Sequence, residues 1–409
     1  YLNSINMKDE KFSNQLEFSK IRNMKILLTA LLFLMSLPLF IINTSCKGTQ
    51  EKITKKKNSE EKTSKVNEND SVIFSFVFVG CNRVDKSEQN NPSATDSSTA
   101  NLTVLKKICD EITNIQRKPD LFFFLGDLVL GETNTKELDI QLGAWVKLLE
   151  DTAFSKISKA DIELVAVPGN HEMLYKKTHK KIKDHDEWPL KDATEIWMKL
   201  MHPYLPEDRE RITGSDSIIE QMTFSFIRNN VGFIVMNTDT YNEPTETDPY
   251  GIEGIIPTAW ILKKIKEYRD NPEIEHIFIL GHKPYYSYDK PNTGHDGLPE
   301  GPVLWPELNK YHVIAMLSAH IHDYLRMQPG NEGTYQIIAG NGGSQGPAEF
   351  FGYSIINIMK SGDVQLISKG FDKGDPYYTL PDDEPSTVRD ESILSWTKNS
   401  NPYKNPKKK

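Results

Sequence analysis

Cysteine and net positive charge are both scarce in this chain, and each shortage excludes a class of protein. Three cysteines, Cys46, Cys81 and Cys109, stand among 409 residues, too few for a disulfide-stapled scaffold. Lysine and arginine number 49 against 57 aspartates and glutamates, a net charge of -8. Without a basic field, a dedicated nucleic-acid-binding protein is not expected. A hydrophobic content of 38% is enough for one large core or two smaller ones.

A long hydrophobic run lies near the start. Residues 26–42 are almost wholly apolar and follow Met24-Lys25, and short polar residues then lead to Cys46. This order is typical of a bacterial lipoprotein signal peptide over 24–46, with lipidation at Cys46. An uncleaved membrane anchor is the alternative, although Pro38 interrupts the run. Either interpretation predicts an exported protein tethered to a membrane, in the periplasm, at the outer membrane or at the cell surface.

Composition divides the rest of the chain. Because Tyr1 precedes the first methionines, residues 1–23 are interpreted as upstream read-through. Residues 47–70 lack aromatics and have few apolar side chains, which predicts a flexible linker. The globular domain is expected over 71–370, and the polar stretch 371–409 is expected to be a loosely packed tail.

An insertion interrupts the domain at 173–217. It is rich in lysine, histidine, tryptophan and proline. We expect it to form a cap that selects the substrate through its aromatic side chains, which are Tyr175, Trp188, Trp197 and Tyr204.

Hydrophobic patterns within the domain alternate between strands and helices. Short β-branched and aromatic runs predict buried strands, and apolar residues three or four apart predict helices. Such alternation indicates an α/β core. The expected strands are 72–79, 121–125, 162–167, 224–227, 232–237, 277–280, 313–317, 336–339, 353–358 and 363–368, and the expected helices are 102–116 and 257–270.

Four of these strands are followed by a polar residue that can bind metal. These residues are Asp127, Asn170, His282 and His320. In α/β folds, ligands bind outside the carboxyl ends of the strands, so these side chains are expected to meet at one site. Imidazole and carboxylate ligands suit iron, zinc or manganese.

The motifs around them resemble the calcineurin-like metallophosphoesterase superfamily. Gly126-Asp127, Gly169-Asn170-His171-Glu172, Gly281-His282 and Ala319-His320-Ile321-His322 follow one another in that family's order. The resemblance spans about residues 71–370. It implies a four-layer αββα sandwich of two mixed sheets flanked by helices. It also implies hydrolysis of phosphomonoesters or phosphodiesters through a metal-bridging hydroxide.

The same resemblance implies roles for individual residues. Asp127 would bridge two divalent or trivalent metal ions, Fe, Zn or Mn. Asn170, His282 and His320 would complete one site, and His322 would serve the other. His171 would contact phosphate and protonate the leaving group, as a histidine pKa permits.

The first motif departs from the family pattern. Where the family carries D-x-H after the first strand, this chain has Gly80-Cys81-Asn82-Arg83. That arrangement is similar to the alkaline phosphatase D-like branch, in which a cysteine ligates iron, so Cys81 is a candidate thiolate ligand alongside Asp127 and His322. The alternative is a small core residue. Arg83 is a candidate phosphate-binding residue or a surface ion-pair partner.

A second departure concerns Leu130. That branch and the purple acid phosphatases carry a tyrosine ligand at this position, so the match to either is partial. A further segment, the glycine-rich stretch 340–344, lacks the lysine and the helix of a phosphate-binding loop and is interpreted as a tight turn beside the site.

Three functions stay open from the sequence. The first is an active exported phosphohydrolase acting on a phosphate-ester substrate. The second is a catalytically impaired binding lipoprotein on the same fold, which the missing D-x-H motif suggests. The third is a structural role in a surface complex, although no obligate protein partner is evident. Retention of the other ligands favours the first.

Overall fold

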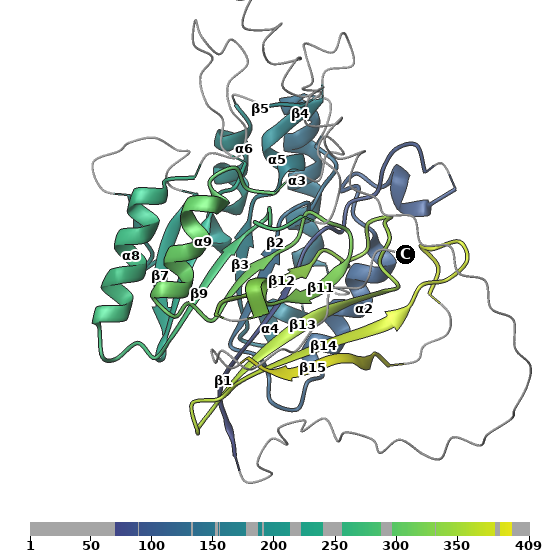
Figure 1. Cartoon of the computed structure of the whole chain (residues 1–409). Helices are drawn as coiled ribbons and strands as arrows, with labels where there is room; N and C mark the ends of the chain where they lie inside the picture. Colours follow the sequence, from purple (N-terminus) through teal and green to yellow (C-terminus); the bar gives the residue numbers. More distant parts are fainter. Residues whose placement is uncertain are drawn as a thin grey trace, which may run out of the picture. The chain divides into compact units, whose positions relative to one another are not determined.

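A computed structural model describes residues 70–88, 90–131, 134–151, 154, 156–176, 187–189, 192–212, 222–239, 256–287, 297–331, 333–380 and 385–394 (Figure 1). Two compact units divide the chain, Tyr1–Thr63 and Ser64–Lys409, and all described residues belong to the second. The predicted read-through, signal peptide with Cys46, and nearly all of the predicted linker lie outside the described residues. None of the helices in the described part has the length and hydrophobicity needed to cross a membrane.

The first sheet has the order β15-β14-β13-β1-β2-β3. Its parallel part consists of β1 (Val72–Val79), β2 (Leu121–Leu125) and β3 (Glu163–Val167). The antiparallel part consists of β13 (Phe350–Met359), β14 (Val364–Asp372) and β15 (Thr387–Ile393). The five residues of β2 are all buried, as expected for a parallel strand covered on both faces.

The second sheet has the order β11-β12-β10-β9-β8-β7-β6. Strands β8, β9, β10 and β12 run parallel, whereas β6, β7 and β11 are antiparallel to their neighbours. The bounds are β6 (Glu210–Arg211), β7 (Phe224–Arg228), β8 (Val231–Met236), β9 (His276–Gly281), β10 (Ala315–Ser318), β11 (Tyr324–Met327) and β12 (Tyr335–Ala339). A separate small ribbon pairs β4 (Leu174–Lys176) with β5 (Glu187–Pro189).

The two sheets pack face to face through aromatic rings. Phe76 of β1 lies edge-on to Phe233 of β8 and Phe278 of β9, with ring centroids 5.2 and 5.1 Å apart. Phe123 of β2 contacts Phe233 at 5.2 Å. Aromatic pairs at such separations stabilise a core beyond the apolar area that they bury.

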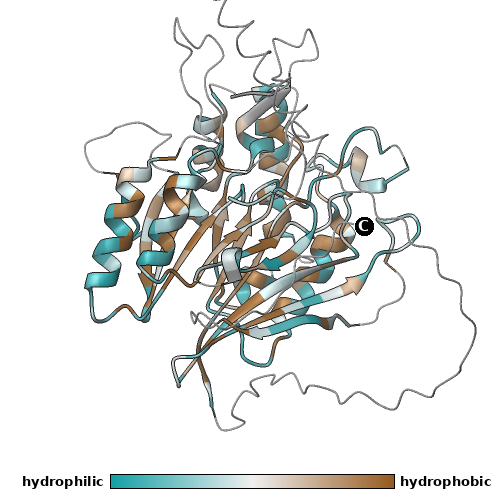
Figure 2. Cartoon of the chain, in the orientation of Figure 1, coloured by the Kyte–Doolittle hydropathy of each residue, from teal (hydrophilic) through white to brown (hydrophobic). Residues whose placement is uncertain are grey.

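Helices cover the outer faces of the sheets. The helices α8 (Thr258–Asp270) and α9 (Gly301–Lys310) pack on β8, β9 and β10, and Figure 2 shows α8 hydrophilic on its outer side. The other sheet packs with α2 (Leu102–Thr113) and α3 (Thr135–Glu150). The predicted architecture of two mixed sheets flanked by helices is confirmed. Shorter helices are α4 (Lys156–Lys159), α5 (Asn170–Met173), α6 (Ala193–Met201), η1 (Pro92–Thr95), η2 (His202–Tyr204) and η3 (Pro329–Asn331).

The polar segment after residue 371 is not uniformly loose, contrary to the prediction. Strand β14 continues to Asp372, and β15 pairs antiparallel with it. Val388 of β15 is exposed whereas Leu394 just after it is buried. An edge strand needs only one backbone neighbour and tolerates charges on its open side, so its sequence resembles a tail.

The predicted cap is also partly wrong. Trp197 of α6 is fully buried in the main core, with Met201 beside it in the same cluster, and cannot contact a substrate. Tyr204 packs partly buried against that core. The side chains of Tyr175 and Trp188 lie outside the described part.

Candidate metal centre

Three candidate residues adopt a left-handed backbone just after their strands. The φ angles are 59° at Cys81, 56° at Asp127 and 64° at His320. Such angles cost a residue with a Cβ atom roughly 1–2 kcal/mol, and they cluster at functional sites. The turns are held in place by backbone bonds: the N–H of Cys81 donates to Gly126 O, and the N–H of Asn82 donates to Asp127 O, both at 3.0 Å.

Side chains from both sheets meet at the carboxyl ends of their strands. His282 Nε2 lies 3.2 Å from Asp127 Oδ1 and 3.0 Å from Asn170 Oδ1. His320 Nδ1 lies 3.1 Å from Asn170 Oδ1 and 3.2 Å from His282 Nε2. The four residues predicted from the strand ends are therefore together, and all are buried.

Backbone carbonyls fix the orientation of the imidazoles. The Nδ1 atom of His282 lies 2.7 Å from Leu125 O, and that of His322 lies 2.6 Å from Gln345 O. A carbonyl only accepts hydrogen bonds, so each Nδ1 carries the proton when the ring is neutral. The Nε2 atom of His282 then presents a lone pair to the centre, the tautomer required of a metal ligand.

The donor set fits a cation. His282 Nε2 lies within 3.2 Å of both Asp127 Oδ1 and Asn170 Oδ1, and all three atoms present lone pairs. When the His282 ring is neutral, such an arrangement repels itself unless a positive charge lies between the atoms. Ligands held at about 2.1 Å from one ion lie roughly 3.0–3.4 Å apart, which agrees with these separations. These residues could hold a metal ion.

Neighbouring charges favour the ionised form of Asp127. Burial opposes ionisation, but His282, His171 and Arg83 together hold the pKa of this carboxyl well below its usual range. The N–H of His171 also lies 3.3 Å from its Oδ1. A carboxylate that stays charged while buried is suited to bind cations.

The two carboxylate oxygens of Asp127 face different neighbours. Oδ1 lies toward His282, whereas Oδ2 lies 3.9 Å from Cys81 Sγ and 3.7 Å from Arg83 Nε. A single aspartate thus connects two groups of side chains.

Cys81 lies beside this carboxylate rather than in a remote part of the core. Cys81, Asp127 and His282 offer ligand atoms that all lie within 4.8 Å of one another. The sequence grouped Cys81 with His322 instead; His322 is outside this group but close enough to lower the pKa of Asp127. Burial and the nearby Asp127 charge raise the pKa of the Cys81 thiol. Only a strong positive charge such as a bound metal ion would make it a thiolate.

The glycine-rich segment 340–346 joins the two halves of the site. The N–H of Ser344 donates to Cys81 O at 2.9 Å, and its hydroxyl donates to Arg83 O at 2.8 Å. The next residue, Gln345, supplies the carbonyl that orients His322. Its first part, 340–344, is therefore the turn beside the site that the sequence predicted, and the whole segment positions residues of both sheets.

Glu172 is a buried residue whose role the sequence did not reveal. Its carboxyl accepts the N–H groups of Asp127 at 3.0 Å, Val129 at 3.1 Å and Gly169 at 2.7 Å. It therefore ties the turn after β2 to the turn after β3. Burial and the Asp127 charge raise its pKa to about 7. An acid after Gly-Asn-His was the only sequence signal.

The close approach of these two turns requires glycine at position 169. A Cβ atom there would lie 2.4 Å from both the backbone nitrogen and Oδ1 of Asp127. Such a contact is sterically impossible without moving the carboxylate. This close packing explains why the Gly-Asn-His motif begins with glycine in this structure.

His171 and Leu130 are connected through the backbone. His171 Nδ1 lies 2.7 Å from Leu130 O, which fixes the proton on that nitrogen. The Leu130 side chain is buried, so no ligand replaces the family's tyrosine at this position. Its carbonyl instead orients the candidate general acid.

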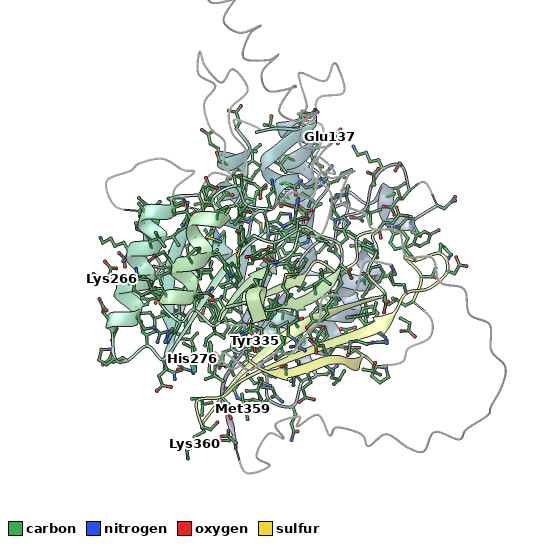
Figure 3. The ribbon with its side chains drawn as sticks, in the orientation of Figure 1. Glu137, Lys266, His276, Tyr335, Met359 and Lys360 are labelled. Carbon is green, nitrogen blue, oxygen red and sulfur yellow. The ribbon has the colours of Figure 1, made fainter. Side chains whose placement is uncertain are left out.

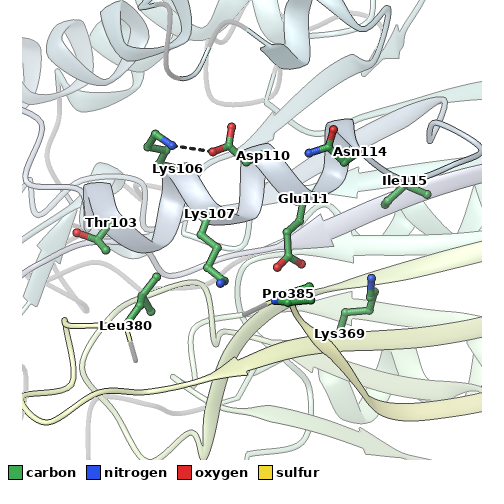
Figure 4. Close-up of a pocket in the computed structure, with 10 residues that line it drawn as sticks. All are labelled: Thr103, Lys106, Lys107, Asp110, Glu111, Asn114, Ile115, Lys369, Leu380 and Pro385. Atoms are coloured by element: carbon green, nitrogen blue, oxygen red, sulfur yellow. Dashed lines mark hydrogen bonds and ion pairs between the residues drawn. The ribbon is translucent and has the colours of Figure 1, made fainter. Parts of the chain in front are cut away.

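Other features lie away from this centre. His276 begins β9, at the end of that strand opposite His282, and Figure 3 shows it in the lower part of the view. A groove of about 880 Å³ lies between α2 and β14, lined in part by Lys106, Asp110 and Lys369 (Figure 4). Lys106 and Lys156 already neutralise Asp110 at 2.7 and 2.6 Å. This groove contains none of the candidate ligands.

Comparisons with known proteins agree with these motifs. The family model for calcineurin-like phosphoesterases matches residues 94–324, more than half of the chain. No curated protein matches the sequence. Among solved structures, the chain is similar to PhoD (11% identity, 79% of this chain and 72% of that one, TM-score 0.48). It is also similar to GAP50, the anchor in the inner membrane complex of Plasmodium (12%, 79% and 89%, 0.46), and to TT1561 of Thermus thermophilus (13%, 72% and 98%, 0.36).

The matched region contains Asp127, Asn170, His282, His320 and His322, whereas Cys81 and Arg83 precede it. A match of this extent, over a fold of two mixed sheets flanked by helices, shows the family and its chemistry. The chain belongs to the calcineurin-like phosphoesterase family and is a metallophosphoesterase, a hydrolase of phosphate esters.

Proposed function

We propose that this phosphoesterase cleaves phosphomonoesters or phosphodiesters at a two-metal centre built around Asp127. The observation that carries the proposal is the division of its carboxylate: Oδ1 lies toward His282, and Oδ2 lies toward Cys81 and Arg83. Asn170 and His320 would complete the first group of ligands, and Cys81 with His322 would serve the second. When bound, two metal ions supply a nucleophile at neutral pH and neutralise phosphoryl charge.

The chain's own residues would orient and protonate the ester. Arg83 is only 15% exposed in its side chain and pairs loosely with Asp127, so its guanidinium can face a phosphoryl oxygen. His171 keeps one proton on Nδ1 through Leu130 O. A second proton on Nε2 would pass to the leaving-group oxygen, the role of a general acid.

A panel of monoester and diester substrates tests this function. Chelator-treated protein would be reloaded with iron, zinc, manganese or calcium and assayed on p-nitrophenyl phosphate and bis(p-nitrophenyl) phosphate. We expect hydrolysis to depend on the metal and to be lost in His282→Ala. Metal uptake of wild type equal to that of His282→Ala would contradict the proposed centre.

A catalytically impaired binding protein is the second candidate. It is favoured by Cys81, which stands in place of the family's D-x-H motif and whose thiol pKa is raised. A binding protein of this kind would bind inorganic phosphate stoichiometrically and would turn over neither ester. Measurable turnover with any of the four metals would exclude it.

We propose further that the enzyme is exported and lipid-anchored at Cys46. The support is the apolar run 26–42, which short polar residues connect to that cysteine. In a bacterial host, wild type should incorporate a radioactive fatty acid and Cys46→Ser should not. Equal labelling of the two proteins would refute the anchor.

A further inference from the structure

Three buried polar residues follow β8, next to the candidate ligand His282. Asn237, Thr238 and Asp239 are all fully inaccessible to solvent. Strand β8 pairs parallel with β9, with Met236 opposite Gly281, so the two strands end side by side. The segment 237–239 therefore flanks the turn that carries His282. None of the family motifs includes it.

A closed set of contacts joins this segment to the residue after His282. The N–H of Lys283 donates to Thr238 Oγ1 at 3.0 Å, and the Thr238 hydroxyl donates to Asp239 Oδ2 at 2.8 Å. Lys283 Nζ lies 3.0 Å from Asp239 Oδ1. The backbone and the side chain of Lys283 are thus both fixed to the end of β8.

The segment 237–239 is itself held in place. The N–H of Asp239 donates to Asn237 Oδ1 at 3.0 Å, and the N–H of Asn237 donates to Thr223 Oγ1 at 3.0 Å. On the other side, the N–H of Ala319 donates to His282 O at 2.9 Å. The peptide between residues 282 and 283 is therefore fixed from both neighbouring strands.

Stability alone is a weak reason for an ion pair this deeply buried. The side chains of Lys283 and Asp239 are 7% and 0% exposed. Removing two charges from water largely offsets their attraction, and apolar residues of similar size are often no less stable. An ion pair that restrains the backbone next to a metal ligand could instead serve metal binding, since residues that orient ligands tune the affinity of a metal site.

We propose that Asp239 and Lys283 are positioning residues that hold His282 in register with Asp127 and Asn170 for metal binding. The inference rests on the proposed function of His282 as a ligand. The pair acts through the backbone on one side of His282, while Leu125 O orients its imidazole on the other. A variant that breaks this ion pair keeps every metal ligand, but the position of His282 relative to the other ligands is less restrained.

The test is titration of the metal-stripped full chain with zinc chloride, at a temperature well below unfolding. Asp239→Asn should weaken zinc affinity about 10- to 100-fold, the usual range for residues that orient ligands. Raising the zinc concentration should then restore kcat. Thr238→Val removes only the hydroxyl link and should weaken affinity by a smaller factor; it also serves if Asp239→Asn does not fold.

Glu163→Gln is the control. Glu163 pairs with Arg228 at 2.7 Å and begins β3, so it lies at the end of that strand opposite the candidate ligand Asn170. It should lower the melting temperature without changing zinc affinity. An equal loss of zinc affinity in this control would reduce the Asp239 effect to general destabilisation and overturn the proposal.

The outcomes separate this proposal from the proposed function. If His282→Ala loses zinc affinity but Asp239→Asn and Thr238→Val bind as wild type, the pair is not a positioning device and the metal centre stands. If His282→Ala also binds as wild type, the centre itself is wrong. If Lys283→Met raises KM with unchanged zinc affinity, Lys283 contacts the substrate and the positioning role is overturned.

Discussion

His282 Nδ1 lies 2.7 Å from the carbonyl oxygen of Leu125, although Leu125 ends a strand of one sheet and His282 follows a strand of the other. The last residue of β2 thereby sets the tautomer of a ligand that follows β9. Asp127, two residues after Leu125, meets the same imidazole at 3.2 Å. The packing of one sheet on the other therefore determines the geometry of the candidate centre, and each sheet alone supplies an incomplete set of ligands.

Substitution of the shared carboxylate tests this dependence directly. Asp127→Asn keeps the shape of the side chain but removes the charge that would hold two ions, so hydrolysis should fall by about 100-fold or more. Metal content measured by mass spectrometry should fall with it. Asp110→Asn on the outer face of α2 is the control and should retain both. Near-normal turnover in Asp127→Asn would contradict the bridging role.

The stability of metal-free protein should depend on pH through Glu172. Its pKa is raised from 4.5 to about 7 in the folded chain by burial and by Asp127. Between these values the folded state holds a proton that the unfolded state has lost. Stability contributed by this group is therefore full below pH 4.5 and declines as pH rises toward 7, by up to about 1.4 kcal/mol per pH unit.

Glu172→Gln isolates that contribution. The amide cannot ionise, so the difference in unfolding free energy between wild type and variant should fall from pH 4.5 to about 7 and then level off. Urea unfolding at closely spaced pH values would measure it. Below pH 4.5 the variant should be less stable than wild type, since a backbone N–H group that bonds to the carboxyl loses its acceptor, at a cost of about 1–3 kcal/mol. A difference that does not vary with pH would contradict the raised pKa.

Much of the fold was readable because its strands are buried on both faces. The predicted strands 72–79 and 121–125 coincide with β1 and β2. Helix α9 was not predicted, because it contains Pro302 and Pro306, and proline within a segment argues against a helix. Strand β15 was not predicted because its charges stand on an exposed edge.

The candidate site was readable only in part. Polar residues after strands predicted Asp127, Asn170, His282 and His320. The closeness of Cys81 to His282 was not predicted, because the distance between them depends on how the two sheets pack. The left-handed backbone at Cys81 and His320 also leaves no trace in residue type, since neither is glycine.

The general-acid role of His171 predicts that its loss slows esters with poor leaving groups more than esters with good ones. Its Nδ1 is held by Leu130 O, so only Nε2 can deliver a proton. His171→Asn should slow alkyl phosphates by roughly 100-fold or more, whereas aryl esters with acidic phenols should lose far less. A Brønsted plot of kcat/KM against leaving-group pKa measures the effect. An equal loss for both classes would assign His171 to phosphate binding alone.

Cys81 and Cys109 provide an internally matched pair for the thiolate hypothesis. Both are buried and free, and burial raises the pKa of both thiols, that of Cys109 to about 12. Only Cys81 lies near Asp127 and His282. Metal ligation would lower the pKa of the Cys81 thiol and shield it from alkylation. Removing the metal with a chelator should therefore raise the alkylation rate of Cys81 but not that of Cys109, and reloading the metal should reverse the change.

Substitutions test the same hypothesis. Cys81→Ser should lower metal stoichiometry and, with iron bound, remove thiolate-to-iron absorption, while Cys109→Ser should do neither. Cys81→Asp should recover binding with a shift toward manganese, because carboxylate oxygen suits harder ions than sulfur does. Unchanged stoichiometry in Cys81→Ala would make Cys81 a core residue and leave the second ion to Asp127 and His322.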